Sequence, residues 1–241
     1  MNFIPLASSS AGNAYLVTAE GVPPLLLECG IPIKQLREKL WSHGVSLSDL
    51  AGCLVSHAHS DHSKAVKDLL RAGVDCYMSY ETARALDVDI SHRVYSINLA
   101  SAYPLLLPDW IVKFFPLVHD AAGASGFFIG NGNERLLFIP DTAFVTNRFV
   151  GVNILAIECN HISDVLSENI LSGHVPAAVG RRVRRNHMSL SVVKDFILAN
   201  NMQKTLREIH LIHLSDANSS EERMIREVQE ATGIPCKVAG V

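Results

Sequence analysis

Short apolar runs alternate along this chain with longer segments in which apolar residues recur every three or four positions. Short apolar runs between turn-forming residues predict buried strands, and the longer spacing predicts amphipathic helices. The predicted strands are 13–18, 24–28, 52–56, 76–79, 111–118, 126–129, 135–139, 153–158 and 208–214. Strands that alternate with helices favour an α/β architecture.

Helices are predicted at 33–43, 61–72, 176–185, 191–200 and 220–232. Gly44, Gly73 and Gly233 follow three of them, where glycine readily adopts the left-handed backbone that closes a helix. Ser219 and Glu222 have the spacing of a capping box at the start of the last helix.

Size and composition predict one globular domain over residues 1–241. No low-complexity segment divides the chain, and its length is near the upper size for one continuous core. With 48% hydrophobic and 19% charged residues, it is too apolar for a disordered segment. The net charge of -3 excludes a protein that coats polyanions through a basic surface.

Targeting features and cysteine usage predict a cytoplasmic protein that has no membrane association. No apolar stretch is long enough to span a membrane, and residues 1–13 lack the pattern of a secretion signal. The five cysteines are an odd number without a Cys-x-x-Cys pair, so we expect buried thiols, not disulfides or a cysteine zinc site.

The chain has eleven histidines, and one segment stands out because four residues of metal-binding type lie within six positions. His57, His59, Asp61 and His62 directly follow a predicted strand. In extended backbone His57 and His59 project to one side and can bind one cation, while Asp61 and His62 can face a second. A ligand set of histidine and aspartate without cysteine suits zinc, manganese or iron better than calcium. An isolated His-x-His is usually a surface feature, but this full pattern favours a metal site.

The same segment resembles the signature of the metallo-β-lactamase superfamily of hydrolases. His119, Asp141 and His213 stand at the family's remaining landmarks, in order along the chain. The resemblance implies that His119 completes the first metal site, that Asp141 bridges both metals and that His213 completes the second. It also implies a four-layer αββα sandwich and, because relatives often pair, leaves a homodimer open.

Four further segments, 7–13, 27–30, 157–161 and 186–189, resemble the branch of that superfamily that contains WalJ/YycJ-type exonucleases. This branch hydrolyses phosphodiesters. Two departures stand out, because the family usually carries Asp in place of Glu28 and Gly in place of Asn186. Glu28 has one more methylene, yet its carboxylate can still orient a ligand histidine.

The chemistry implied by the resemblance uses two divalent metal ions, zinc or manganese, and a metal-bridging hydroxide that attacks phosphorus. Asp61 and Asp141 would also hydrogen-bond this nucleophile. By resemblance, His187 would contact the scissile phosphate and protonate the leaving group; the alternative is a residue beside the start of the next helix. Glu158 and His161 would orient His187, line the cleft or form a buried structural pair.

Arg182 and Arg185 belong to the one dense basic run, 181–185, which either holds substrate phosphates or is a solvated helix face. His43, His92 and His210 are interpreted as structural.

Three functions remain in view. The first is a DNA or RNA nuclease of exonuclease type; the second is a phosphodiesterase for cyclic nucleotides or similar small molecules. The third is a catalytically inactive metal-binding module, which is disfavoured because every expected ligand is retained. The missing export signal disfavours a secreted β-lactamase.

Overall fold

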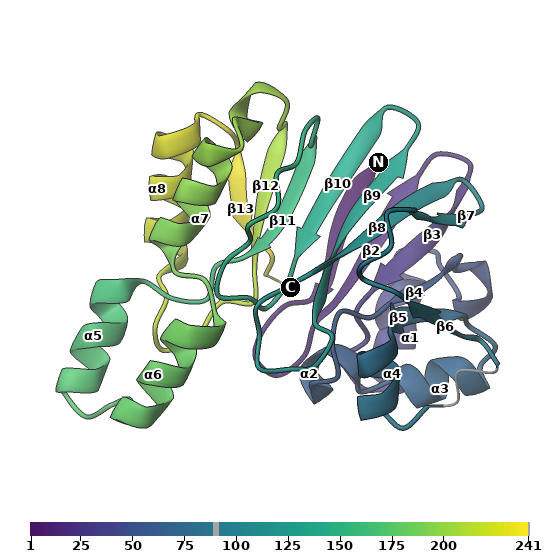
Figure 1. Ribbon diagram of the computed structural model, residues 1–241, viewed down its shortest axis with the longest axis horizontal. Coiled ribbons are helices and arrows are strands. Elements are labelled where there is room, and N and C mark those ends of the chain that lie inside the picture. The colour runs from purple at the N-terminus through teal and green to yellow at the C-terminus, as the bar shows by residue number, and fades with distance from the viewer. Residues whose placement is uncertain (89–91, 241) are drawn as a thin grey trace. The chain divides into compact units, whose positions relative to one another are not determined.

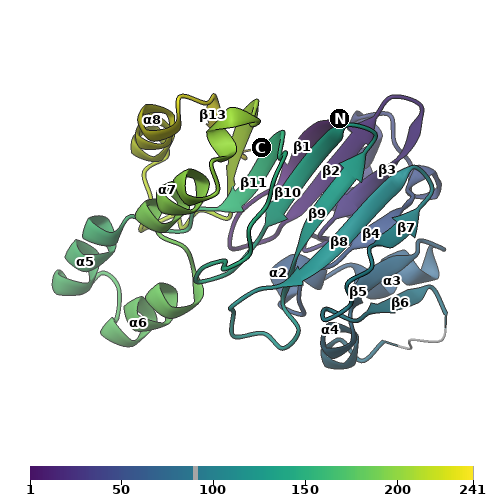
Figure 2. The same cartoon turned by 45° about the horizontal axis from the view of Figure 1, so that its top comes forward.

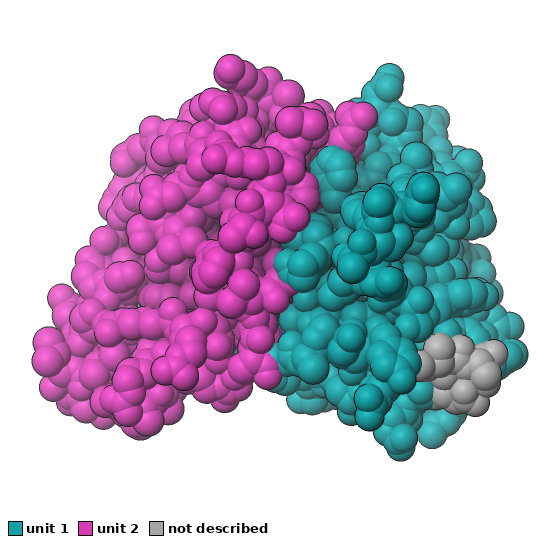
Figure 3. All heavy atoms as spheres, in the orientation of Figure 1, with its two compact units in different colours: residues 1–116, 121–134, 240–241 teal, residues 117–120, 135–239 magenta. Residues whose placement is uncertain are grey.

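The computed structural model describes residues 1–88 and 92–240. It divides into two compact units, which are coloured separately in Figure 3. Unit 1 comprises residues 1–116, 121–134 and 240–241, and unit 2 comprises residues 117–120 and 135–239. The single domain expected from the sequence stays a prediction, and each unit is described by itself.

A six-stranded sheet in the order β1-β2-β3-β4-β5-β6 forms the frame of unit 1 (Figure 1). Its strands are β1 (Asn2–Ala7), β2 (Ala14–Ala19), β3 (Val22–Leu27), β4 (Gly52–Leu54), β5 (Cys76–Ser79) and β6 (Val94–Ile97). The first three strands pair antiparallel, and β3 to β6 pair parallel. Parallel neighbours require crossovers. These contain α1 (Ile33–Ser42), α2 (Ser60–Ser63), α3 (Val66–Arg71) and α4 (Tyr80–Ala85).

Both faces of this sheet are covered. Leu36 of α1 and Leu69 of α3 join the buried cluster on one face. The other face meets the antiparallel strands β7 (Leu105–Leu107), β8 (Trp110–Pro116) and β9 (Ser125–Asn131), as Figure 2 shows. There the indole of Trp110 is buried and donates a hydrogen bond of 2.8 Å to the Pro23 carbonyl. Unit 1 therefore has one layer of buried side chains on each face of the strands β1 to β4.

Four parallel strands form the frame of unit 2, in the order β13-β12-β11-β10. They are β10 (Glu134–Ile139), β11 (Ile154–Glu158), β12 (Glu208–Ile212) and β13 (Cys236–Val238). The helices are α5 (Ser163–Leu171), α6 (Ala177–Asn186), α7 (Leu190–Ala199) and α8 (Glu221–Thr232). Figure 1 shows α5 and α6 as a pair away from these strands. Short 3₁₀ turns occupy Leu47–Asp49 in unit 1 and Met202–Lys204 in unit 2.

Every predicted strand is present within a few residues of its expected bounds. The prediction missed β1, β6, β7 and β13, together with α4 and α5. β7 and β13 have three residues each, too few for a period to show. β6 exposes its two central residues, so its apolar pattern is weak.

Two helix predictions were wrong in detail. The helix expected at 61–72 is two short helices, because the Ala65 amide leaves the helical pattern and donates to the Cys29 carbonyl at 2.9 Å. The capping box at Ser219 is absent, since its hydroxyl donates to the Ser215 carbonyl. Ser220 caps α8 in its place, accepting from the Arg223 amide.

Two other expectations concern cysteines and membranes. All five cysteines are free and buried, as predicted. Within residues 1–88 and 92–240, no helix has the length and apolar character needed to cross a membrane.

Candidate active site

The first group of candidate ligands lies in unit 1, where the chain leaves β4 and enters α2. We call His57, His59, Asp61 and His62 the histidine cluster. His57 lies three residues after the end of β4, and His59 is the N-cap of α2, with its carbonyl accepting from the His62 and Ser63 amides. The strand end and the first helical turn thus place four donor side chains within six residues.

The donors of the histidine cluster converge. His57 Nε2 and His59 Nδ1 are 3.1 Å apart, and the rings of His57 and His62 have centroids 4.2 Å apart. Two nitrogens on one tetrahedral zinc, with bonds of about 2.0–2.1 Å, would be about 3.3 Å apart. Ser56 Oγ bonds His57 Nδ1 at 2.8 Å, which leaves Nε2 as the metal-facing atom. The spacing fits a shared cation.

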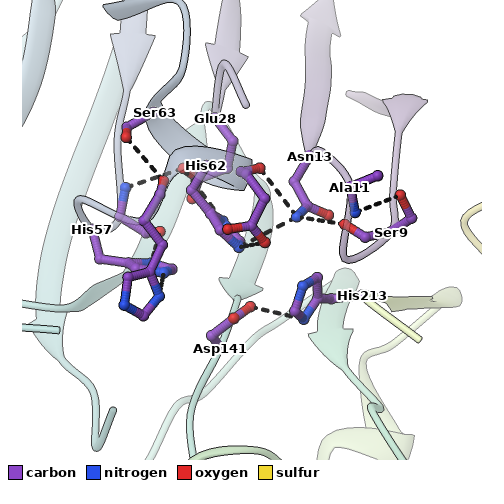
Figure 4. Close-up of polar contacts among 12 residues, drawn as sticks. Ser9, Ala11, Asn13, Glu28, His57, His62, Ser63, Asp141 and His213 are labelled. Atoms are coloured by element: carbon purple, nitrogen blue, oxygen red, sulfur yellow. Dashed lines mark hydrogen bonds and ion pairs between the residues drawn. The ribbon is translucent and has the colours of Figure 1, made fainter. Parts of the chain in front are cut away.

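Glu28 and Asn13 fix His62 (Figure 4). Glu28 Oε2 lies 3.7 Å from His62 Nδ1, and Asn13 Nδ2 lies 3.3 Å from His62 Nε2. Glu28 is fully buried, has φ of 62° and accepts from the Ser56 amide. Burial raises its pKa, although His62 and Ser56 oppose the shift. The expected carboxylate therefore does lie beside a candidate ligand histidine.

Close backbone packing supports the same motif. Asn13 donates from its amide and its side chain to the Asp61 carbonyl, at 2.7 and 3.2 Å. A Cβ at Gly30 would lie 1.7 Å from that carbonyl oxygen, so only glycine fits there. Asn13, at the end of the segment 7–13, therefore holds the backbone of the histidine cluster.

The second group lies in unit 2, at the carboxyl ends of its parallel strands. We call Asp141, Glu158, His187 and His213 the carboxylate cluster. Asp141 follows β10, Glu158 ends β11, His213 follows β12 and His187 is the C-cap of α6. One ligand atom from each lies within 4.8 Å of the others. Parallel strands bring their carboxyl ends to one edge, which explains how distant residues meet.

Glu158 organises the carboxylate cluster. Its Oε1 lies 2.5 Å from His187 Nδ1 and 3.3 Å from His213 Nδ1, and its Oε2 accepts from the Thr142 and Met188 amides. Burial opposes the charged carboxylate, but the charge of His187 and the hydrogen bonds of His187 and His213 lower its pKa overall. Burial likewise opposes charge on His187, yet Glu158 raises the His187 pKa overall. The pair therefore favours a carboxylate with an imidazolium.

Asp141 has histidine neighbours on two sides. Its Oδ1 lies 3.0 Å from His213 Nδ1, a contact drawn in Figure 4, and its Oδ2 lies 3.8 Å from His119 Nε2. His213 has a left-handed backbone with φ of 54°. Such a conformation is strained for a residue with a side chain and is common at functional sites.

His119 is oriented by a backbone carbonyl. Its Nδ1 lies 3.1 Å from the Asn186 carbonyl oxygen, so Nδ1 carries the proton and Nε2 remains for a metal. Burial lowers the His119 pKa, which favours the neutral ring that metals bind. Asn186 Nδ2 also donates to Asp120 Oδ2 at 2.7 Å. Sequence reasoning missed Asp120, although it stands next to His119.

The remaining candidates differ in their surroundings. His161 is buried with a pKa lowered to about 4 by burial, and its Nδ1 has no hydrogen-bond partner among the described residues. Glu158 forms the hydrogen bond with His187, whereas the charge of His187 helps to lower the His161 pKa. Arg182 and Arg185 are exposed on α6, and Arg182 Nε binds Asp120 Oδ2 at 3.0 Å.

The histidines interpreted as structural lie outside both clusters. His43 and His92 are exposed, whereas His210 is buried 3.2 Å from Glu208.

Comparisons with known proteins agree with these observations. Residues 25–191 match the family described as the Beta-lactamase superfamily domain. Exodeoxyribonuclease YycJ of Bacillus anthracis is 28% identical over 92% of this chain and 85% of its own. Exodeoxyribonuclease WalJ of Streptococcus pneumoniae serotype 2 is 26% identical over 97% of this chain and 91% of its own.

A solved structure supports the same fold. The metallo-β-lactamase fold protein YhfI from Bacillus subtilis has a TM-score of 0.75 and 16% identity, and the match covers 99% of this chain and 97% of that one. At this identity the likeness shows the fold alone, the expected αββα sandwich. The family match over more than half of the chain shows that it belongs to the metallo-β-lactamase superfamily of hydrolases, and most of its length is similar to YycJ and WalJ.

Proposed function

We propose that this protein is a metal-dependent phosphodiester hydrolase that removes nucleotides from the ends of nucleic acids, with DNA as its first substrate. The observation that carries the proposal is the likeness to two exodeoxyribonucleases over more than nine-tenths of the chain. The Glu158–His187 pair supports it, because cleavage of a phosphodiester requires a proton for the leaving oxygen. With DNA as its substrate, the protein would act in the cytoplasm.

The proposed metal ligands are His57, His59, Asp61, His62, His119, Asp141 and His213. The donor chemistry fits two divalent cations, because imidazole nitrogens and carboxylate oxygens suit zinc and manganese. The converging nitrogens of His57 and His59 support this assignment within unit 1. When bound, such cations would lower the pKa of water and neutralise charge on a phosphoryl oxygen.

The chain's own groups would handle the protons. Asp61 would hydrogen-bond the attacking water and accept the one proton that it releases as its oxygen bonds to phosphorus. Glu158 would hold the His187 Nδ1 proton, so that Nε2 presents the second proton. His187 Nε2 would give that proton to the leaving oxygen as the phosphorus–oxygen bond breaks.

The test is nucleotide release from an end-labelled linear DNA duplex by protein loaded with manganese or with zinc. We expect short labelled products, and we expect Asp61→Ala to abolish them. An exposed aspartate, Asp68, provides the matched control, since Asp68→Ala should leave release unchanged. If the duplex stays intact while cyclic nucleotides are hydrolysed, the protein is a small-molecule phosphodiesterase and not a nuclease. An assembly into homodimers stays a prediction.

A further inference from the structure

The basic helix α6 has two kinds of arginine. Arg182 Nε binds Asp120 Oδ2 at 3.0 Å, and Arg184 Nη2 donates to Ser167 Oγ of α5 at 2.8 Å. Arg181 and Arg185 are exposed, and neither makes a hydrogen bond or an ion pair within residues 1–88 and 92–240. Two guanidinium groups are thus committed to the protein, and two are available to a ligand.

The other faces of α6 explain this division. Gly180 packs on α5, where an added Cβ would lie 2.3 Å from Ile170 Cδ1. Asn186 and Arg182, four residues apart, both bind Asp120 Oδ2. At 100° per residue, Arg181 and Arg185 differ by about 40° and share the face between these two contacts. Neighbours in the fold therefore fix α6 and leave this face to solvent.

The charge of this face is uncompensated. α6 contains no acidic residue. Of the two acidic residues on α5, Asp164 is paired with Arg223, and Glu168 forms no ion pair with an arginine of α6 within residues 1–88 and 92–240. Cations near a helix C-terminus offset its dipole, which accounts for Arg185 but not for Arg181, in the middle of the helix. A chain with net charge -3 has thus placed two unpaired guanidiniums one helical turn apart.

The position of α6 supplies the connection to chemistry. His187, whose Nδ1 contacts Glu158, is the C-cap residue of this helix. Arg185 lies two residues before His187, and Arg181 lies one further turn away along the helix. A strand whose scissile phosphate is at His187 can continue along this face. Side chains four residues apart start about 5–6 Å from each other, so two guanidiniums can reach successive phosphates.

We propose that Arg181 and Arg185 form a phosphate clamp that holds the polynucleotide backbone beside the scissile phosphate, whereas Arg182 serves to fix α6 through Asp120. This inference rests on the proposed function and sharpens it, because a clamp of two phosphates is useful for a polymer and not for a cyclic nucleotide. It also reassigns Arg182, which the sequence offered as a substrate contact.

The test measures the affinity for a fluorescent DNA duplex with phosphorothioate ends, which resist cleavage, at a series of salt concentrations. Each phosphate contact contributes about 0.7–0.9 to the slope of log affinity against log salt. We expect the Arg181→Gln/Arg185→Gln protein to bind more weakly and to lose about 1.4–1.8 from this slope. Each single variant should lose half of that, which keeps the test available if the double variant does not fold.

The control is Arg37→Gln/Arg226→Gln, which removes two exposed arginines from other helices and gives the same net charge. We expect its slope to equal that of the wild type. Equal slopes for both double variants would overturn the clamp. If the wild type still releases nucleotides from an ordinary duplex, the proposed function survives that loss. If the wild type neither binds nor cleaves DNA, both proposals fail together.

Discussion

The histidine cluster of unit 1 and the carboxylate cluster of unit 2 are built from similar donors in opposite ways. His57, His59, Asp61 and His62 lie within six consecutive positions, so one strand end and one helical turn suffice to place them. The four members of the carboxylate cluster come from separate segments between Asp141 and His213. The first cluster depends on local backbone, whereas the second depends on the parallel strands that gather their own ends.

The buried carboxylates of the two clusters differ as well. Glu28 has one backbone amide donor, and its Oε1 has no hydrogen-bond partner among the described residues, so burial dominates and raises its pKa. Burial opposes the charge on Glu158 as well, but the charge of His187 and the hydrogen bonds of His187 and His213 outweigh it and lower the Glu158 pKa. Equal burial thus has opposite consequences, because neighbouring charges and hydrogen bonds determine which protonation state is stable.

The largest expected effect comes from removing one donor from each cluster. His57→Ala and Asp141→Asn should each reduce turnover and metal affinity by more than about 100-fold, because even outer-sphere partners of a metal contribute 10- to 100-fold. Metal analysis and phosphodiester hydrolysis measure both effects, with Asp68→Asn as the control. A loss confined to one of the two variants would show that a single cluster holds the metal.

A comparison of Glu158→Gln with Glu28→Gln tests the difference between the buried carboxylates. On metal-free protein, Glu158→Gln should cost about 3 kcal/mol of unfolding free energy, because it breaks a buried charge pair with His187. Glu28→Gln should cost about 1 kcal/mol or less, because Glu28 is the more easily protonated carboxylate. Urea unfolding at neutral pH measures both, and equal costs would contradict the distinction.

His210 should make the stability of the protein sensitive to acid. Its pKa is lowered from 6.5 to about 4 by burial and by Lys237, with Glu208 opposing the shift. The unfolded chain therefore takes up a proton more readily, so stability is full above about pH 6.5 and falls as the pH decreases toward 4. The full loss is up to about 3 kcal/mol.

His210→Gln should flatten this dependence in urea unfolding between pH 7 and 4. The exposed His43 is the matched residue of unit 1, and His43→Gln should preserve the pH dependence of the wild type. An unchanged pH profile for His210→Gln would remove this histidine as the cause.

The smallest expected effect concerns the helix caps. Ser220→Ala should cost about 1 kcal/mol, because it removes the side-chain acceptor at the start of α8. Ser79 caps α4 of unit 1 in the same way, accepting from the Thr82 amide at 3.1 Å, and Ser79→Ala should cost at least as much. Thermal unfolding measures both costs. If Ser219→Ala costs more stability than Ser220→Ala, Ser219 caps α8, contrary to the structure.

The sequence predicted those features that neighbouring residues determine. The strands β2 to β5 and β8 to β12 were expected, since each has a local apolar pattern. The segment from His57 to His62 was recognised because its four donors stand together in the chain. Short elements such as β7 and β13 escaped prediction, because pairing with β8 and β12 maintains them more than their own residues do.

Only the tertiary structure decided which distant groups meet. The contact of Glu158 with His187, the carbonyl of Asn186 at His119 and the role of Asp120 join segments far apart in sequence. The break before α3 has the same origin, because the Ala65 amide donates to the Cys29 carbonyl. Local patterns specify helices, strands and compact motifs, but the partner of a buried polar group is set by whichever segment packs against it.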